Sequence, residues 1–124
     1  MINAISVDLE DWYHICGIDN SRWVDEWYKY SAQLEQNVEK VLALFRKYNI
    51  RATFFVVGFI AEKNPDLIKK IAKEGHELAS HGYYHRRIFD MTPKEFEEDL
   101  IKSKEIIESA SGKKVLGYRA PEWS

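Results

Sequence analysis

Three carboxylates stand within four residues near the start of the chain, at Asp8, Glu10 and Asp11. They follow segment 4–8, whose alternation of apolar and polar residues predicts a short buried strand that ends in a polar turn. Folds of the α/β class place ligand sites at the carboxyl ends of their strands, so this position favours a functional role. Carboxylates this close repel one another, and either a bound cation or solvent exposure offsets the repulsion. The cluster alone leaves both interpretations open.

Two histidines, His81 and His85, directly follow segment 76–80, which predicts a weaker strand. In a helical turn, side chains four residues apart lie on one face, so both imidazoles would point toward one metal ion. Zinc, cobalt or iron suits such a pair, although the spacing alone often arises by chance. Parallel strands share one carboxyl edge, where a carboxylate would join the histidines. Two histidines and one carboxylate leave coordination positions open for water and substrate, as hydrolytic metal sites require.

A third group of residues lies at the end of segment 115–119, which predicts a fourth strand with its end at the same edge. Arg119 is either a surface cation or the cation that neutralises and orients a carboxylate of the site. Pro121 stiffens the turn that follows, and Trp123 offers a flat apolar face to a ligand or to the core.

Strands and helices alternate along the chain, and this order would bring the three groups together. The predicted strands are 4–8, 52–58, 76–80 and 115–119, and the predicted helices are 33–48, 65–75 and 92–112. Asn64 is predicted to cap the second helix, and Thr92 and Glu95 form a capping box at the third. The run 52–58 lacks alternation, which predicts a strand covered on both faces. The alternation of elements predicts parallel pairing through right-handed crossovers, and therefore the α/β class.

Composition narrows the class of protein. The 124 residues are 45% hydrophobic and carry a formal net charge of -2, which suits one folded domain and argues against a nucleic-acid partner. No apolar stretch approaches the length of a membrane-spanning helix, about 18 residues, and the N-terminus lacks the features of a signal peptide. We therefore expect no membrane segment, and the location stays open between cytoplasmic and exported. Cys16 is the only cysteine, so no internal disulfide can form.

The ordered set of motifs resembles a known family. The acidic end of the first strand, segment 51–58, segment 75–81 with His85, and segment 118–121 are together similar to the polysaccharide deacetylases with a NodB homology domain, carbohydrate esterase family 4. The similarity spans nearly the whole chain in the expected order and spacing. It is greatest to the branch whose first motif is Asp-x-Glu-Asp-aromatic, represented here by residues 8–12.

This resemblance implies a distorted (β/α)7-type barrel with parallel strands, of which this chain is the N-terminal portion. It also implies a divalent metal, zinc in the first place and cobalt or iron as alternatives, held by one carboxylate and by His81 and His85. Asp8 would be the general base that activates the attacking water, and Arg119 would pair with that base. The residues expected to contact a carbohydrate polymer are Trp12, Pro121 and Trp123.

The identity of the carboxylate ligand stays open. The family's first motif has two adjacent aspartates, base and then ligand, whereas this chain has Asp8-Leu9-Glu10-Asp11. Strand alternation would place Asp8 and Glu10 on one side and favour Glu10 as the ligand. A strand that ends at Leu9 would allow the turn to present Asp11 instead. In a third alignment Glu10 and Asp11 are the adjacent pair, and Glu10 is the base.

The resemblance further implies residues that this chain is expected to lack. The family's later motifs, with the histidine that acts as general acid, belong to the C-terminal half of the barrel, and no histidine follows His85. We therefore expect residues 1–124 to be a single NodB-like deacetylase domain truncated after its third motif. The open sheet edge of such a portion invites pairing with a second copy, as a homodimer.

The leading hypothesis is a metal-dependent hydrolase that removes N-acetyl groups from a polysaccharide of the N-acetylglucosamine type, with activity that this portion alone need not retain. The aromatic segment 12–32 favours a carbohydrate, because flat rings stack on sugar faces, although packing under a barrel rim explains it almost as well. Two alternatives stand beside it. One is an amidase that cleaves a C–N bond in a small molecule, and the other is a non-catalytic module that binds carbohydrate or supports assembly.

Overall fold

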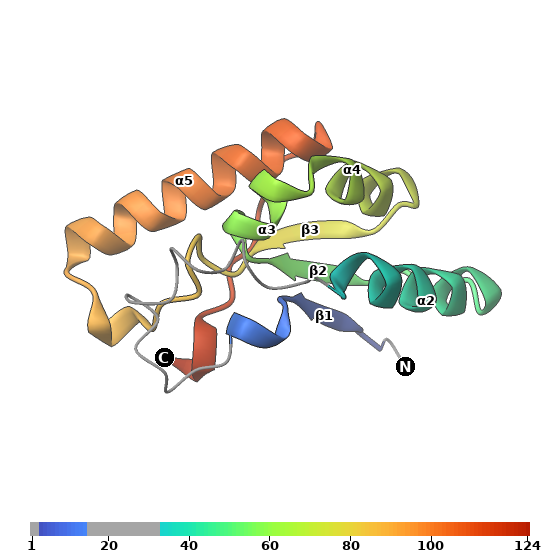
Figure 1. Ribbon diagram of the computed structural model, residues 1–124, viewed down its shortest axis with the longest axis horizontal. Coiled ribbons are helices and arrows are strands. Elements are labelled where there is room, and N and C mark those ends of the chain that lie inside the picture. Colours follow the sequence, from blue (N-terminus) through green and yellow to red (C-terminus); the bar gives the residue numbers. More distant parts are fainter. Residues whose placement is uncertain (1–2, 15–32) are drawn as a thin grey trace.

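Helices cover one face of a parallel sheet in the described part of the chain, residues 3–14 and 33–124 (Figure 1). The structure is a computed structural model. Most of the predicted aromatic segment, including Trp23, Trp27, Tyr28 and Tyr30, lies outside the described residues. In chain order the elements are β1 (Ser6–Leu9), η1 (Trp12–His14), α2 (Leu34–Lys47), β2 (Thr53–Val56), α3 (Gly58–Lys63), α4 (Pro65–Lys73), β3 (Glu77–Ser80), η3 (Ile88–Asp90), α5 (Pro93–Ser111) and η4 (Pro121–Trp123), where η denotes a 3-10 helix.

The sheet has three strands in the order β1-β2-β3, and both pairings are parallel. Leu9 pairs with Val56, and Val56 pairs with Ser80, so the carboxyl ends of the three strands lie level with one another. Residues that follow β1 and β3 therefore emerge at the same edge of the sheet. The predicted α/β class with parallel strands is confirmed.

β2 buries one of its faces rather than two. Phe54 and Val56 are fully buried, whereas Thr53 and Phe55 stay partly exposed. The buried face packs against apolar side chains of α2, α4 and α5, among them Val38, Leu42, Phe45, Ile68, Ile71 and Ile107. The prediction of a strand covered on both faces was therefore wrong within the described residues. Phe55 lies on the other face, where the guanidinium carbon of Arg119 is 3.9 Å from the centroid of its ring. Because this cation covers the ring, an apolar residue on that face does not require a second layer of helices.

Segment 115–119 does not form the predicted fourth strand. It makes a single parallel bridge to β3, between Tyr118 and Ser80. The Ser80 N–H donates to the Gly117 carbonyl, and the Arg119 N–H donates to the Ser80 carbonyl, each at 2.9 Å. Earlier in the segment, the Val115 N–H donates to the Glu108 carboxylate of α5 at 2.9 Å. The helix therefore holds the start of this segment, and only its end, which carries Arg119, reaches the sheet.

α3 is an element that the sequence pattern did not predict, because Gly58 was assigned to the end of a strand. The helix begins at Gly58 because the backbone there packs closely against two other segments. A Cβ atom on Gly58 would lie 2.8 Å from Cδ2 of Tyr83 and 3.0 Å from Cα of Ser103 on α5. The N–H groups of Gly58 and Phe59 donate to the carbonyls of Gly82 and Tyr83, at 2.8 and 3.0 Å. α3 is thus joined to the segment that follows β3.

The ends of the longer helices follow local signals. At the start of α5, the Glu95 N–H donates to the Thr92 hydroxyl at 3.3 Å and the Thr92 N–H donates to the Glu95 carboxylate at 2.7 Å. This reciprocal pair is the predicted capping box, and Gly112 ends the helix in the left-handed conformation, with φ of 69°. Asn64 occupies the position before α4, but its amide donates to the Ile60 carbonyl at 3.1 Å instead of capping α4. The predicted side-chain cap at Asn64 was therefore wrong.

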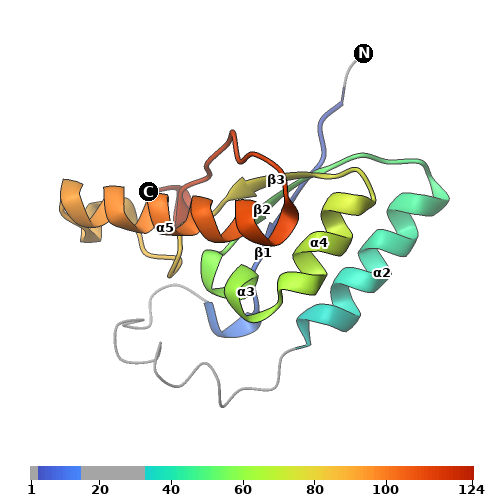
Figure 2. The same cartoon turned by 90° about the horizontal axis from the view of Figure 1, so that it is seen from above.

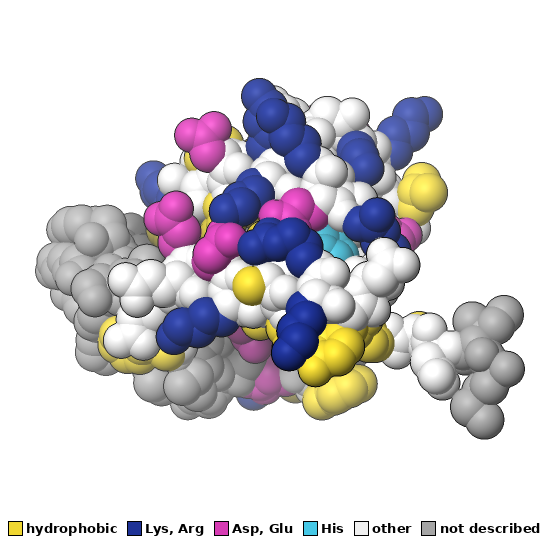
Figure 3. All heavy atoms as spheres, turned by 90° about the vertical axis from the view of Figure 1, so that its right-hand side faces the viewer, with side chains coloured by type: hydrophobic (Ala, Val, Ile, Leu, Met, Phe, Trp, Pro, Cys, Tyr) yellow, Lys and Arg dark blue, Asp and Glu magenta, His cyan; other side chains and the backbone are white. Residues whose placement is uncertain are grey.

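α4 lies between α2 and α5 (Figure 2). Ion pairs at the surface connect α2 with α4, where Arg46 contacts Glu74 at 2.5 Å and Lys70 contacts Glu39. Acidic and basic side chains alternate on the face that includes these pairs (Figure 3). Exposed pairs contribute at most about 1 kcal/mol each, so apolar packing of the helices on the sheet carries most of the stability.

No helix within residues 3–14 and 33–124 combines the length and the apolar composition needed to cross a lipid bilayer.

Substitution of Gly58 tests the close packing of α3. In an open helix, a change from glycine to alanine is favourable by up to about 1 kcal/mol. Here the added methyl group meets Tyr83 and the α5 backbone, so we expect Gly58→Ala to lower the free energy of unfolding by about 1–3 kcal/mol. Urea unfolding followed by circular dichroism measures the change. The control Lys69→Ala, exposed on α4, should shift stability by less than about 0.5 kcal/mol. A Gly58→Ala chain as stable as the wild type would contradict this packing.

Candidate metal centre and active site

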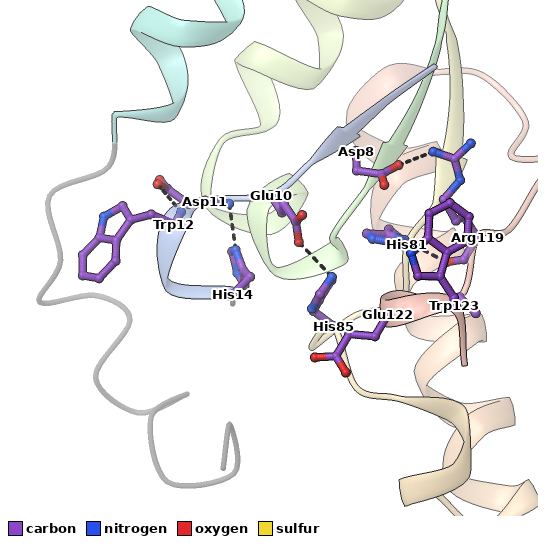
Figure 4. A pocket seen from close by; sticks show the side chains of 11 residues that line it. Asp8, Glu10, Asp11, Trp12, His14, His81, His85, Arg119, Glu122 and Trp123 are labelled. Atoms are coloured by element: carbon purple, nitrogen blue, oxygen red, sulfur yellow. Dashed lines mark hydrogen bonds and ion pairs between the residues drawn. The ribbon is translucent and has the colours of Figure 1, made fainter. Parts of the chain in front are cut away.

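Side chains from the ends of β1 and β3 and from the segment after Tyr118 converge on one cavity of about 420 Å³ (Figure 4). The cavity lies at the carboxyl edge of the sheet, where the sequence placed the site. Its lining residues are Asp8, Glu10, Asp11, Trp12, His14, His81, His85, Arg119, Ala120, Glu122 and Trp123. Every predicted site residue except Pro121 is in this set.

Glu10, His81 and His85 form a group that could hold a metal ion. One ligand atom from each of them lies within 4.8 Å of the others. Glu10 Oε2 is 2.8 Å from His85 Nε2, and both histidines are buried. The donor set, two imidazole nitrogens and one carboxylate oxygen, suits zinc and the other divalent transition metals. A cation bound between these atoms would replace the proton that Glu10 and His85 share. The residues therefore fit the predicted divalent metal.

The electrostatics of the same residues favour ligation. Burial acts to raise the pKa of Glu10, but the hydrogen bond from His85 and the nearby imidazoles outweigh it, and the pKa is lowered. Burial lowers the pKa of His81, against an opposing hydrogen bond to the Arg119 carbonyl. An ionised carboxylate and a neutral imidazole are the forms that bind a metal. His81 Nδ1 lies 2.8 Å from that carbonyl and donates to it, which leaves Nε2 as the ligand atom.

Arg119 also orients Asp8. Its Nη1 lies 2.5 Å from Asp8 Oδ1, and its Nη2 donates to the Ser6 hydroxyl at 2.9 Å. The predicted pairing of Arg119 with Asp8 is therefore present in the structure. Ser6 was not predicted, although its place two residues before Asp8 puts both side chains on the same face of β1. Through its carbonyl and its guanidinium, Arg119 fixes both a histidine and a carboxylate of the cavity.

Asp11 faces away from the two histidines (Figure 4). Its Oδ1 accepts the Trp12 N–H at 2.9 Å, and its own N–H donates to His14 Nδ1 at 2.8 Å. Asp11 is buried, and its Oδ2 has no hydrogen-bond partner within the part of the chain that the structure describes. The geometry therefore places Glu10, and not Asp11, with the histidines. Alternation favoured Glu10 on the assumption that the strand extends that far, whereas β1 ends at Leu9.

His14 lines the cavity but was not among the predicted site residues. It is fully buried, and its ring lies 6.2 Å from the His85 ring, centroid to centroid. Burial lowers the pKa of His14 to about 4, and repulsion from His85 adds to this effect. Because His14 Nδ1 accepts the Asp11 N–H, the neutral ring carries its proton on Nε2. In the sequence, the signal that could have placed His14 at the site is its position three residues after Asp11.

Two exposed tryptophans flank the polar centre. Trp12 is 53% exposed and Trp123 is 94% exposed, so both rings offer a face to a ligand. Pro121 is buried and is not a lining residue, so its predicted contact with substrate has no support in the structure. Glu122, which was not predicted, does line the cavity, and its carboxylate lies 3.6 Å from Nη1 of Arg87.

The segment from His81 to His85 is not the helical turn that the spacing of the histidines suggested. Its residues have no helical assignment, and Gly82 and His85 adopt left-handed backbone conformations, with φ of 76° and 55°. The two imidazoles meet because the chain turns twice, and their ring centroids lie 4.8 Å apart. Convergence of this pair therefore depends on hydrogen bonds that come from outside the segment.

The fold and the site together define an α/β protein with a polar, metal-ligand-rich cavity at the carboxyl edge of a parallel sheet. Residues 24–124 match the polysaccharide deacetylase family. A peptidoglycan deacetylase from Helicobacter pylori is 40% identical over 89 residues, which are 72% of this chain and 30% of that protein. The chain therefore belongs to the polysaccharide deacetylase family.

Solved structures agree with this assignment. A peptidoglycan N-acetylglucosamine deacetylase is similar with a TM-score of 0.74 and 25% identity, over 98% of this chain and 46% of the other. A CE4 family pseudoenzyme from Bacillus anthracis is similar with a TM-score of 0.76 and 21% identity, over 98% and 35%; at this identity the likeness concerns the fold alone. The predicted relation to the N-terminal portion of the NodB barrel of carbohydrate esterase family 4 is confirmed. The chain spans less than half of each of these relatives.

Paired substitutions distinguish the two candidate carboxylate ligands. We expect Glu10→Gln to weaken zinc binding by more than about 100-fold, since loss of an outer partner alone costs about 10–100-fold. Asp11→Asn removes the same charge from the same turn and should change the affinity by less than about 10-fold. Isothermal titration of chelator-stripped protein gives both dissociation constants. The opposite order of the two effects would assign the ligand to Asp11.

The low pKa of His14 predicts a pH-dependent stability. The unfolded chain binds a proton at this residue below about pH 6.5, whereas the folded chain stays neutral there down to about 4. This contribution to the free energy of unfolding is therefore complete above pH 6.5 and is lost as the pH falls toward 4. In His14→Gln, the same decline should be smaller. Urea unfolding of metal-free protein between pH 7.5 and 4.5 measures it, and equal slopes for both chains would refute the assignment.

Proposed function

We propose that this chain carries the metal-binding and general-base half of a deacetylase that removes N-acetyl groups from a polysaccharide of the N-acetylglucosamine type. The observation that carries the proposal is the presence, in one cavity, of the Glu10, His81 and His85 group beside the Asp8–Arg119 pair. Membership of the polysaccharide deacetylase family supports it. The Helicobacter pylori relative, a peptidoglycan deacetylase, supports a glycan substrate.

The reaction is hydrolysis of an acetamide, in which water adds to the carbonyl, the C–N bond breaks, and acetate and an amine leave. When a divalent cation is bound, it supplies Lewis acidity toward the carbonyl. Asp8 is the base that takes a proton from the attacking water. The Arg119 guanidinium holds Asp8 in the lining of the cavity, and it keeps this carboxylate apart from Glu10, which contacts His85.

The amine requires a proton as it leaves, and we assign that step to none of the described histidines. His81 and His85 are the proposed metal ligands, and His14 lies fully buried with its Nδ1 bonded to the Asp11 N–H. His76 is buried against Phe45 and Phe54 and does not line the cavity. We retain the expectation that the leaving-group acid is contributed from outside residues 1–124. On this view the chain binds metal and glycan and performs little turnover by itself.

The two exposed tryptophans support a carbohydrate ligand. An indole face stacks on the apolar face of a pyranose ring, and Trp12 and Trp123 present such faces on the lining of the cavity. We infer that successive sugar units lie along these rings while the acetamide of one unit enters between them. Of zinc, cobalt and iron, we propose zinc, because catalytic zinc sites use two imidazoles and one carboxylate.

Binding of a chitooligosaccharide tests this function on the chain as it stands. We expect isothermal titration with zinc present to detect binding that removal of the metal weakens by about 10-fold or more, since the acetamide then loses its strongest partner. A fully deacetylated oligomer of equal length is the matched ligand control and should bind weakly in both conditions.

Two outcomes would contradict the proposal. Binding of equal strength with and without chelator would indicate a carbohydrate-binding module that does not use the metal. In a form of the protein that releases acetate, full activity after the double substitution His81→Ala and His85→Ala would exclude a metal-dependent hydrolase at this site. Asp8→Asn should leave zinc binding intact and reduce acetate release by about 100-fold or more, as expected for loss of a general base.

A further inference from the structure

The segment that carries both candidate histidine ligands has an unusual backbone. From His81 to His85 it is neither helix nor strand, and His85 adopts a left-handed conformation with φ of 55°. For a residue with a side chain, this conformation costs about 1–2 kcal/mol, so neighbouring groups must hold it in place. The groups that do so determine where the imidazoles point.

One side of this segment is held by α3. The carbonyls of Gly82 and Tyr83 accept the first two N–H groups of that helix, from Gly58 and Phe59, at 2.8 and 3.0 Å. These bonds fix the carbonyl groups of the turn. The N–H groups of Tyr83 and Tyr84 still need hydrogen-bond acceptors, which must come from another element.

α5 holds the other side. The Asp99 carboxylate accepts the Tyr83 N–H through Oδ2 at 2.7 Å and the Tyr84 N–H through Oδ1 at 3.3 Å. One turn later on the same helix face, the Ser103 hydroxyl donates to the Gly82 carbonyl at 3.2 Å and lies 2.8 Å from the Ser80 hydroxyl.

We infer that Asp99 is a positioning residue for the metal centre. Resting on the proposed function, this inference adds that a carboxylate on α5, outside the cavity lining, sets the geometry of the ligand His85. Asp99 accepts the N–H groups of the two residues directly before His85, and the fit to Gly82 is close, because a Cβ there would lie 3.1 Å from Asp99 Oδ2.

The two acceptor atoms explain why a carboxylate is required. Successive N–H groups point at one side chain, and each needs its own oxygen. Asparagine has a single carbonyl oxygen, and its NH₂ group would face the second N–H. The substitution Asp99→Asn therefore keeps nearly the same side-chain size but leaves one peptide N–H without an acceptor. We expect this loss to loosen the turn at His85 while the apolar core stays intact.

The test compares Asp99→Asn with Glu98→Gln, an equal loss of charge on the adjacent, exposed residue of α5. Cobalt titrations of the chelator-stripped chain give the affinity, and the visible absorption of bound cobalt reports coordination geometry. We expect Asp99→Asn to weaken cobalt binding by about 10–100-fold, the range for loss of a group that orients a metal ligand, and to change the spectrum. Glu98→Gln should match the wild type in both. A folded Asp99→Asn chain with the wild-type affinity and spectrum would overturn the inference.

Hydrogen exchange provides a second measurement that needs neither metal nor a folded variant. In the metal-free wild-type chain, the amides of Tyr83 and Tyr84 should exchange more slowly than the amide of exposed Lys94, which precedes the first intrahelical bonds of α5. Rapid exchange at both tyrosines would overturn the inference even if Asp99→Asn failed to fold. A wild-type chain that binds no cobalt but protects these amides would refute the proposed metal site and leave the hold of Asp99 on the turn standing.

Discussion

Hydrogen bonds from two helices to one short turn are the constraint on which the rest of the site depends. The turn after β3 carries His81 and His85 and has no regular structure to hold it. The α3 N–H groups bind its carbonyls, and the Asp99 carboxylate on α5 binds its N–H groups. Small residues at Gly58 and Gly82 permit these approaches. The sheet edge alone would bring these residues near one another, but the hydrogen bonds from α3 and α5 orient the imidazoles.

The charges of the cavity are arranged in two pairs that keep its carboxylates apart. Glu10 contacts His85 on one side, and Asp8 contacts Arg119 on the other. Arg119 also contacts the second histidine of the group, because its carbonyl accepts from His81 while its guanidinium holds Asp8. The carboxylates proposed as ligand and as base therefore occupy separate parts of one cavity. The roles proposed for the two carboxylates follow from which basic side chain each one contacts and not from their order in the chain.

Local signals predicted the elements, whereas contacts between distant segments determined the details of the site. The capping box at Thr92 and the left-handed Gly112 follow from nearby residues and were predictable. The loss of the fourth strand follows from the bond between Val115 and Glu108, and the helix at Gly58 from its fit against Tyr83. The motifs predicted His81 and His85 as candidate ligands, which the structure brings together with Glu10, and left the choice of carboxylate open. Asp11 lies apart from the two histidines because its N–H donates to His14, a contact that strand alternation does not encode.

The central claim is that Glu10, His81 and His85 bind one divalent cation. The most direct measurement is anomalous diffraction at the zinc edge from crystals of the zinc-loaded chain. A single strong peak is predicted at about 2.0–2.2 Å from Nε2 of both histidines and from a Glu10 oxygen, with at least one further position open to solvent. A peak bound through Asp11, or no peak among these three side chains at saturating zinc, would contradict the account.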